Sequence, residues 1–159
     1  MDRVLNRTFH KQWNDRSASR PFDFNLELYI VRHGETEFNR MHVVQGRGVD
    51  SDLNQTGQEQ ARRFFAAHRS VPFEHVYVSS LRRTRQTAQP FIASGLPWSA
   101  HAELDEIDWG QQEGQKPSEA MKRRYRHIMD KWSEGKLDLA LPGGESPTQV
   151  AERIDAFLE

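Results

Sequence analysis

The chain has 159 residues, 36% of them hydrophobic and 28% charged, with a formal net charge of -1. This length and composition predict one soluble domain, and no apolar run approaches the ~20 residues of a membrane-spanning helix, which excludes an integral membrane protein. The small net charge gives no general attraction to nucleic acid or membrane lipid, and the absence of cysteine excludes disulfides and thiol chemistry and favours a cytoplasmic location.

Residues 1–25 differ from the rest of the chain because they are polar, mildly basic and without sustained periodicity. A signal peptide needs a continuous apolar stretch behind its basic start, and this segment contains none. We therefore expect a disordered or flexible N-terminal extension, which would also result from an over-extended gene start. A short docking arm is the alternative.

Two short apolar runs predict β-strands. Residues 26–31 (LELYIV) and residues 75–79 (HVYVS) are both rich in apolar and β-branched side chains. The first run leads directly into residues 32–36 (RHGET). This motif is therefore expected at the carboxyl end of a strand, where open α/β sheets bind their ligands.

Two helices are expected in the first half of the chain. Thr56 and Glu59 have the spacing of a capping box and predict the start of the first helix. The second begins near Leu81. We expect Pro90 to kink or shorten it and Gly95 to end it.

Two more helices are expected in the second half. One covers about residues 117–134 and stops at Gly135. The last begins at Ser146 and Pro147, with Gln149 as the capping partner, and continues to the end of the chain. The expected buried side of the first consists of Met121, Tyr125, Ile128, Met129 and Trp132. That of the last consists of Val150, Ala151, Ile154, Phe157 and Leu158. The overall order of elements favours an α/β fold with a parallel-rich sheet.

The pair Arg32 and His33 has chemistry that suits attack on phosphorus. A neutral imidazole presents one nitrogen lone pair, while its other nitrogen can be fixed by donating to a backbone carbonyl. A guanidinium offers a planar fork of donors that matches two phosphate oxygens. Most such pairs are solvated surface groups or satisfied core groups, so the pair alone is weak evidence.

The surrounding sequence resembles the histidine phosphatase superfamily, also called the phosphoglycerate mutase-like family. Five blocks match in the right order: RHGETEFN (32–39), QGRGVDSDLNQTGQEQA (45–61), SSLRRTRQTA (79–88), ELDEIDWGQQEG (103–114) and GGESPTQVAER (143–153). The resemblance implies a three-layer α/β/α sandwich with a mostly parallel sheet over residues 26–159.

The same resemblance assigns roles to individual residues. His33 would be the nucleophile that becomes phosphorylated. Glu106 would protonate the leaving oxygen and then activate the water that hydrolyses phosphohistidine. The remaining residues, which would bind the phosphate or line the substrate pocket, are Arg32, Asn39, Gln45, Gly46 and Arg83. An acidic surface loop is the competing interpretation of Glu106, because other carboxylates share its segment.

We therefore expect hydrolysis of a small phosphorylated metabolite through a phosphohistidine intermediate, without metal or organic cofactor. Nucleic acid and membrane are not expected as partners, and the sequence leaves the oligomeric state open. A phosphoglycerate mutase is the alternative enzyme. The segment at residues 106–110 looks closer to phosphatase branches, including fructose-2,6-bisphosphatase, than to mutases.

One feature of the superfamily is missing from the sequence. Its members carry a second active-site histidine on a late strand, and no histidine follows Ser146 here. Losing one preorganised donor typically lowers the rate by about 10²–10³. We expect a domain that lacks its C-terminal strand or strands through truncation or an interrupted gene. The alternative is a natural short protein that binds phosphate and is inactive as an enzyme.

Overall fold

The computed structural model describes residues 27–159, so the extension expected over residues 1–25 lies outside the described residues. The described chain falls into two units, residues 27–32 and residues 33–159, and each is described by itself. The larger unit contains all the helices and strands of the described chain.

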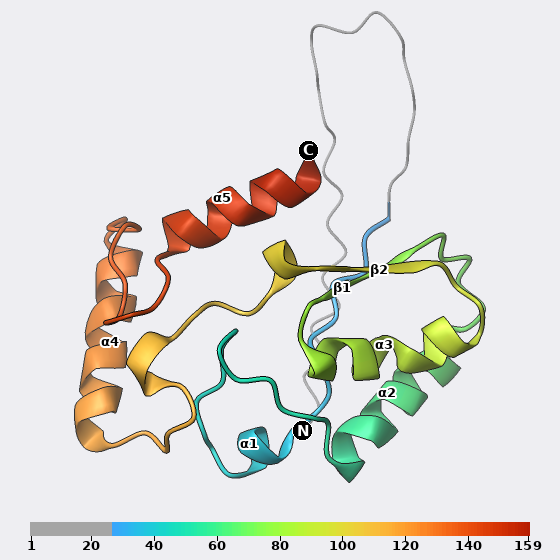
Figure 1. The fold of residues 1–159 in the computed structure, drawn as a ribbon, viewed down its shortest axis with the longest axis horizontal. Coiled ribbons are helices and arrows are strands. Elements are labelled where there is room, and N and C mark those ends of the chain that lie inside the picture. The colour runs from blue at the N-terminus through green and yellow to red at the C-terminus, as the bar shows by residue number, and fades with distance from the viewer. Residues whose placement is uncertain (1–26) are drawn as a thin grey trace, which may run out of the picture. The chain divides into compact units, whose positions relative to one another are not determined.

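A parallel β-α-β arrangement forms one part of the larger unit. Strand β1 (Val76–Ser79) leads through helix α3 (Arg82–Ala93) to strand β2 (Trp98–His101). The strands pair in parallel, with Val76 opposite Trp98, and Figure 1 shows α3 running beside them. The α/β fold class with a parallel sheet is therefore confirmed. The sequence does not predict β2, because its WSAH segment contains no β-branched residue.

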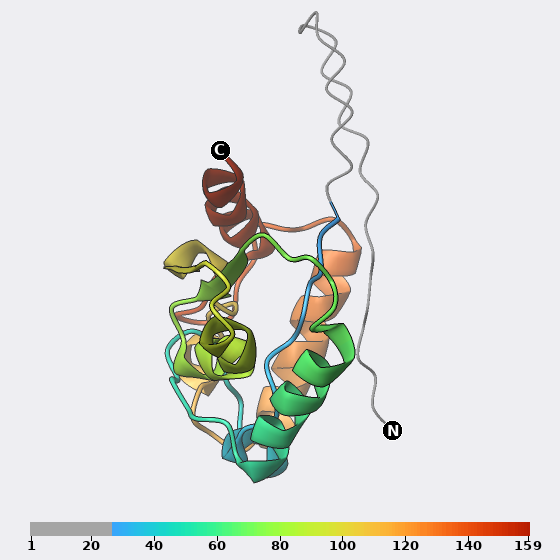
Figure 2. The same cartoon turned by 90° about the vertical axis from the view of Figure 1, so that its right-hand side faces the viewer.

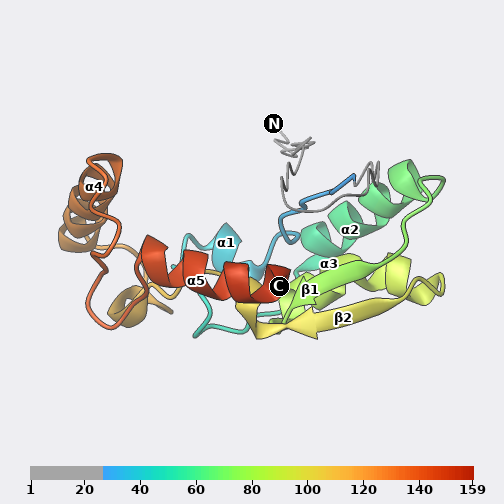
Figure 3. The same cartoon turned by 90° about the horizontal axis from the view of Figure 1, so that it is seen from above.

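Helix α2 (Gln55–His68) packs along α3, as Figures 1 and 3 both show. It begins one residue before the predicted Thr56. Its N-cap is Asn54, whose side-chain oxygen accepts a hydrogen bond from the Gly57 N–H at 2.9 Å. Glu59, the expected capping partner, forms ion pairs with two arginines further along the helix. The helix is confirmed, but the predicted capping box is wrong.

The other expected helices are α4 (Glu119–Ser133) and α5 (Pro147–Leu158). The predicted capping box of Ser146 and Gln149 is present at the start of α5. Gly135 follows α4 with φ +82°, the left-handed conformation that ends a helix. Figures 1 and 2 show both helices. Within residues 27–159, no helix combines the length and apolar character needed to cross a bilayer.

The buried faces of these two helices differ from expectation. Met121 and Ile128 of α4 are buried, whereas Tyr125 is 43% exposed. Helix α5 has no buried residue, and Leu158 is 69% exposed. The aromatic ring of Phe157 packs edge-on against two rings of the strands, at centroid distances of 5.4 and 4.9 Å. The apolar side of α5 is therefore only partly covered within residues 33–159.

The predicted strand over residues 26–31 is wrong for residues 27–31, which have no regular secondary structure. A strand is defined by a ladder of hydrogen bonds to a neighbouring strand. Within residues 27–159 that ladder exists between β1 and β2 alone. Leu28, Ile30 and Val31 are 47%, 56% and 39% exposed, so the apolar pattern that predicts a buried strand is left uncovered.

An aromatic cluster joins α2 to α3. Phe91 is 7% exposed, and the rings of Phe64, Phe65 and Phe73 lie 5.7, 5.0 and 5.6 Å from its centroid. Because α3 also carries Arg83, this cluster fixes the helix on which part of the predicted site depends.

Phe91→Ala should lower the free energy of unfolding by about 3–5 kcal/mol, because it removes a buried ring and leaves a cavity. Leu158→Ala, on an exposed side chain, should change it by less than about 0.5 kcal/mol. Urea unfolding followed by circular dichroism measures both values. Equal losses for the two variants would show that the aromatic cluster does not hold the fold together.

Candidate active site

His33 lies at the start of the larger unit with its ring held by the next residue. Its Nδ1 is 2.7 Å from the carbonyl oxygen of Gly34. A carbonyl can only accept a hydrogen bond, so Nδ1 carries the hydrogen and the lone pair of the neutral ring is on Nε2. This is the tautomer that a nucleophile acting through Nε2 requires.

Gly34 ties His33 to two helices. Its N–H donates to Thr87 Oγ1 at 2.9 Å, and that hydroxyl donates to the carbonyl of Arg83 at 2.7 Å. A Cβ at position 34 would stand 2.6 Å from the carbonyl oxygen of Gly57 in α2. Only glycine allows this approach of backbone to backbone. These contacts therefore fix the position of the backbone next to His33 relative to the start of α3.

Arg83 is the only charged side chain among residues 27–159 with 0% exposure. Its guanidinium donates to the carbonyls of Val49 at 2.6 Å and Gly46 at 3.1 Å, while Nε has no partner. None of the ion pairs within residues 27–159 involves it. Burial lowers the pKa of Arg83, and the carboxylate of Glu106 is the largest opposing influence. Nearby carboxylates act on this buried cation without forming an ion pair with it, so its free Nε–H is left to bind an anion.

Asn39 and Gln45 converge on Thr36, which is also fully buried. Thr36 is the N-cap of the short helix α1 (Glu37–Arg40), and its N–H donates to Asn39 Oδ1 at 3.0 Å. Its hydroxyl donates to Gln45 Oε1 at 3.0 Å. The amide Nε2 of Gln45 is buried without a partner and leaves two donors available. The structure therefore gives Asn39 a local capping role, and its predicted contact with phosphate stays a prediction.

Gly46 is buried between Arg83 and a carboxylate that the sequence reasoning missed. A Cβ at Gly46 would stand 1.9 Å from Glu113 Oε1 and 2.4 Å from the carbonyl oxygen of Ile107. The position therefore needs glycine for close packing, and it contributes its carbonyl to Arg83. A role in lining the substrate pocket stays a prediction.

Glu106 is exposed, and one of its oxygens accepts a hydrogen bond from the Ile107 N–H at 3.2 Å. The neighbouring Asp105 is 8% exposed and accepts from the N–H and the hydroxyl of Ser80, both at 2.8 Å. The acidic segment is thus anchored beside the end of β1. Together with its electrostatic influence on Arg83, this places Glu106 near the Arg83 guanidinium.

Glu145 is the centre of a charge network that also escaped the sequence reasoning. Its carboxylate pairs with Arg47 and Arg153, each at 3.0 Å, and accepts from the Asp108 N–H at 2.9 Å. Partial burial raises the pKa of Glu145, but Arg153 and the Asp108 N–H lower it by more. The pKa of Glu145 therefore lies below its usual value. The network joins α5 to the segment that carries Glu106.

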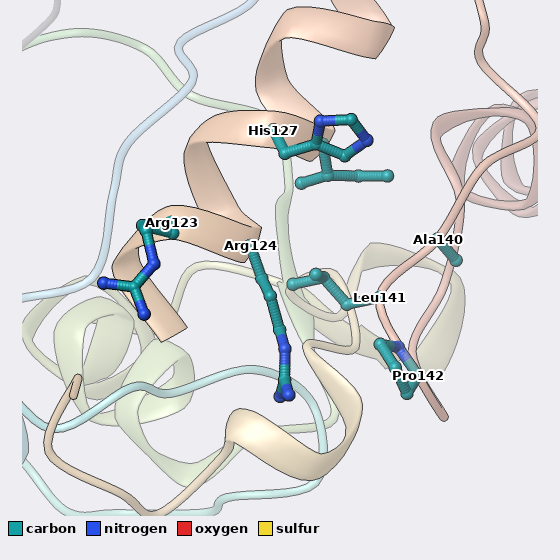
Figure 4. Close-up of a pocket in the computed structure, with 7 residues that line it drawn as sticks. Arg123, Arg124, His127, Ala140, Leu141 and Pro142 are labelled. Atoms are coloured by element: carbon teal, nitrogen blue, oxygen red, sulfur yellow. The ribbon is translucent and has the colours of Figure 1, made fainter. Parts of the chain in front are cut away.

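Three further observations limit the site. Arg32 is exposed and belongs to the smaller unit, so its part in the phosphate clamp stays a prediction. Within residues 27–159, no group of three or more histidine, aspartate or glutamate side chains could hold a metal ion. A cavity of about 410 Å³ between α4 and residues 140–142 is lined by none of the predicted site residues (Figure 4).

Comparison with known proteins matches residues 28–159 to the histidine phosphatase superfamily (branch 1). Over 137 residues the chain is 36% identical to "Fructose-2,6-bisphosphatase TIGAR B" of Danio rerio, covering 83% of this chain and 51% of the relative. It is 32% identical over 134 residues to "Probable phosphoglycerate mutase GpmB" of Citrobacter koseri, covering 84% and 61%. The chain thus spans about half to three fifths of these relatives.

A solved structure gives the same picture of the fold. The protein TTHB049 from Thermus thermophilus superimposes with a TM-score of 0.63 at 34% identity, covering 80% of this chain and 68% of that protein.

Glu145→Gln should destabilise the protein by about 1–3 kcal/mol at neutral pH, because it removes charged hydrogen bonds in a half-buried network. A depressed carboxyl pKa contributes stability above its unfolded value of about 4.3, and this is lost as pH falls through the lower folded pKa. The difference between wild type and variant, measured by urea unfolding, should therefore shrink below about pH 4. A gap that stays constant from pH 7 to pH 3 would contradict the network. Glu134→Gln, in an exposed ion pair, is the control.

Proposed function

The chain belongs to the histidine phosphatase superfamily, and from this premise we propose that it transfers a phosphoryl group from a small phosphomonoester to His33 and then to water. The nucleophile, the positive charge and the proton carrier are all side chains in this proposal. The proposed route therefore includes neither metal nor organic cofactor. A cytoplasmic location, expected from the absence of cysteine, belongs to the same proposal.

In the first step Nε2 of His33 attacks phosphorus, and the bond to the substrate oxygen breaks. The Nδ1–H of the ring remains bonded to the Gly34 carbonyl, which steadies the positive charge on the phosphorylated ring. Glu106 gives its proton to the leaving oxygen. In the second step Glu106 takes a proton from water, the water oxygen bonds to phosphorus, and the bond between phosphorus and Nε2 breaks.

The observation that carries the proposal is the buried guanidinium of Arg83 without a carboxylate partner. Two backbone carbonyls orient it, and its Nε–H has no acceptor. Charge in phosphoryl transfer spreads over the equatorial oxygens, so a preorganised guanidinium stabilises the transition state. Gln45 Nε2 adds neutral donors without a partner of their own.

A phosphoglycerate mutase is the second candidate, favoured by the relative of Citrobacter koseri that carries this name. A mutase returns the phosphoryl group from histidine to an alcohol instead of water. Incubating the protein with a phosphomonoester and a second phospho-acceptor separates the two reactions. A newly phosphorylated acceptor indicates a mutase, and inorganic phosphate alone indicates a phosphatase.

In a phosphatase assay with p-nitrophenyl phosphate, His33→Ala should abolish both turnover and acid-labile phosphate on the protein. Arg83→Lys should lower kcat/KM by about 10²–10³, because lysine cannot reproduce the planar donor fork. His127→Ala, on an exposed face of α4, is the control and should leave the rate unchanged.

Equal rates for wild type and His33→Ala would remove the proposed reaction. Binding of inorganic phosphate that depends on Arg83, without any phosphohistidine, would support the inactive phosphate-binding alternative.

A further inference from the structure

Glu113 is a partly buried carboxylate that the proposed reaction does not use. It follows the short helix η2 (Gly110–Gln112), and its Oε1 accepts a hydrogen bond from the Trp109 N–H at 2.9 Å. Its Oε2 is buried without a hydrogen-bond partner. The Gly48 N–H interacts with the carboxylate but does not reach good hydrogen-bond geometry, so this buried oxygen is satisfied only in part.

The side chain is wedged against two glycines of another segment. A Cβ at Gly46 would stand 1.9 Å from Glu113 Oε1, and a Cβ at Gly48 would stand 2.8 Å from Oε2. At Gly48, all three atoms nearest to such a Cβ belong to Glu113. The carboxylate thus occupies the space that side chains at both positions would fill.

That segment is the one that orients Arg83. The carbonyls of Gly46 and Val49 accept hydrogen bonds from its two terminal nitrogens. Val44, just before it, exchanges backbone hydrogen bonds with Gly114 and Gln115, at 2.9 and 3.0 Å. Residues 44–49 are therefore docked on the same stretch of chain that presents Glu113.

The Trp109 N–H gives the carboxylate a second connection, to the segment that carries Glu106. One side chain therefore touches both the loop that orients the guanidinium and the segment that holds the proton carrier. Partial burial raises the pKa of Glu113, and the backbone N–H groups of Trp109 and Gly48 oppose the shift. The carboxylate thus interacts with the backbone of both segments.

We propose that Glu113 is a positioning residue of the phosphate site, whose carboxylate holds residues 45–49 in the shape that aims Arg83 at the phosphoryl group. The inference rests on the proposed function, since it assumes that Arg83 binds phosphate. Gly46 and Gly48 are required because the carboxylate lies against them.

A double-mutant cycle between Gly48→Ala and Glu113→Ala tests this directly. The structure gives Gly48 no left-handed backbone angle, so alanine is tolerated there once the carboxylate is gone. Two quantities are measured: affinity for inorganic phosphate by calorimetry, and amide exchange of residues 44–49. Glu113→Gln, which keeps the acceptor for the Trp109 N–H, and Glu119→Ala, on the surface of α4, are the controls.

Each single variant should weaken phosphate binding about tenfold and speed exchange at residues 44–49, because small displacements of a binding group lower its effect strongly. The double variant should be no worse than Glu113→Ala, since no carboxylate remains to be displaced. The phosphate affinity of Glu113→Gln should stay within about threefold of wild type, and that of Glu119→Ala should equal the wild-type value. Additive losses in the double variant, or unchanged exchange at residues 44–49 in Glu113→Ala, would overturn the inference.

Arg83→Ala separates this inference from the proposed function. If it binds phosphate as tightly as wild type, the assignment of Arg83 is wrong and the inference falls as a statement about phosphate. If it loses binding while Glu113→Ala retains full affinity with a loosened loop, the proposed function stands and the positioning role is wrong.

Discussion

The burial of the Arg83 guanidinium without a carboxylate partner is the constraint on which the rest of the site depends. Taking a cation out of water is costly, and backbone carbonyls offset only part of that penalty. The chain accepts this because the carbonyls of Gly46 and Val49 orient the guanidinium while leaving its Nε–H unpaired. If Arg83 formed an ion pair with Glu106, its charge would be neutralised and its guanidinium would no longer be available to a phosphate. A phosphate dianion bound here would therefore supply the ion pair that Arg83 lacks.

Backbone groups, more than side chains, place His33 and Arg83. The Gly34 N–H reaches Arg83 through a single threonine hydroxyl, and the Gly34 carbonyl fixes the tautomer of His33. Hydrogen bonds of this kind have little freedom to rearrange, because each uses an atom of the main chain. Glycines at positions 34 and 57 allow a close approach of the two backbone segments beside these bonds. The path of the backbone thus determines the geometry of the site.

Local sequence signals predict much of this fold. β1, α3 and the capping box of α5 depend on neighbouring residues, and each is confirmed. Features that depend on distant partners are harder to predict. Residues 27–31 have the apolar pattern of a strand without a pairing ladder in residues 27–159. Glu113 shows no local pattern, because its role arises from packing against glycines more than sixty positions earlier. The motif around His33 identifies the family, but the acceptors of Arg83 are known only from the structure.

The proposed reaction is best tested by a crystal structure of the protein with orthovanadate, which mimics a phosphoryl group in transfer. We expect vanadium bonded to Nε2 of His33, with a vanadate oxygen within hydrogen-bonding distance of Nε of Arg83. The carbonyls of Gly46 and Val49 should keep their bonds to the guanidinium. Vanadate bound elsewhere, or Arg83 turned to pair with Glu106 while His33 carries no vanadium, would rule out His33 as the nucleophile and Arg83 as its phosphate ligand.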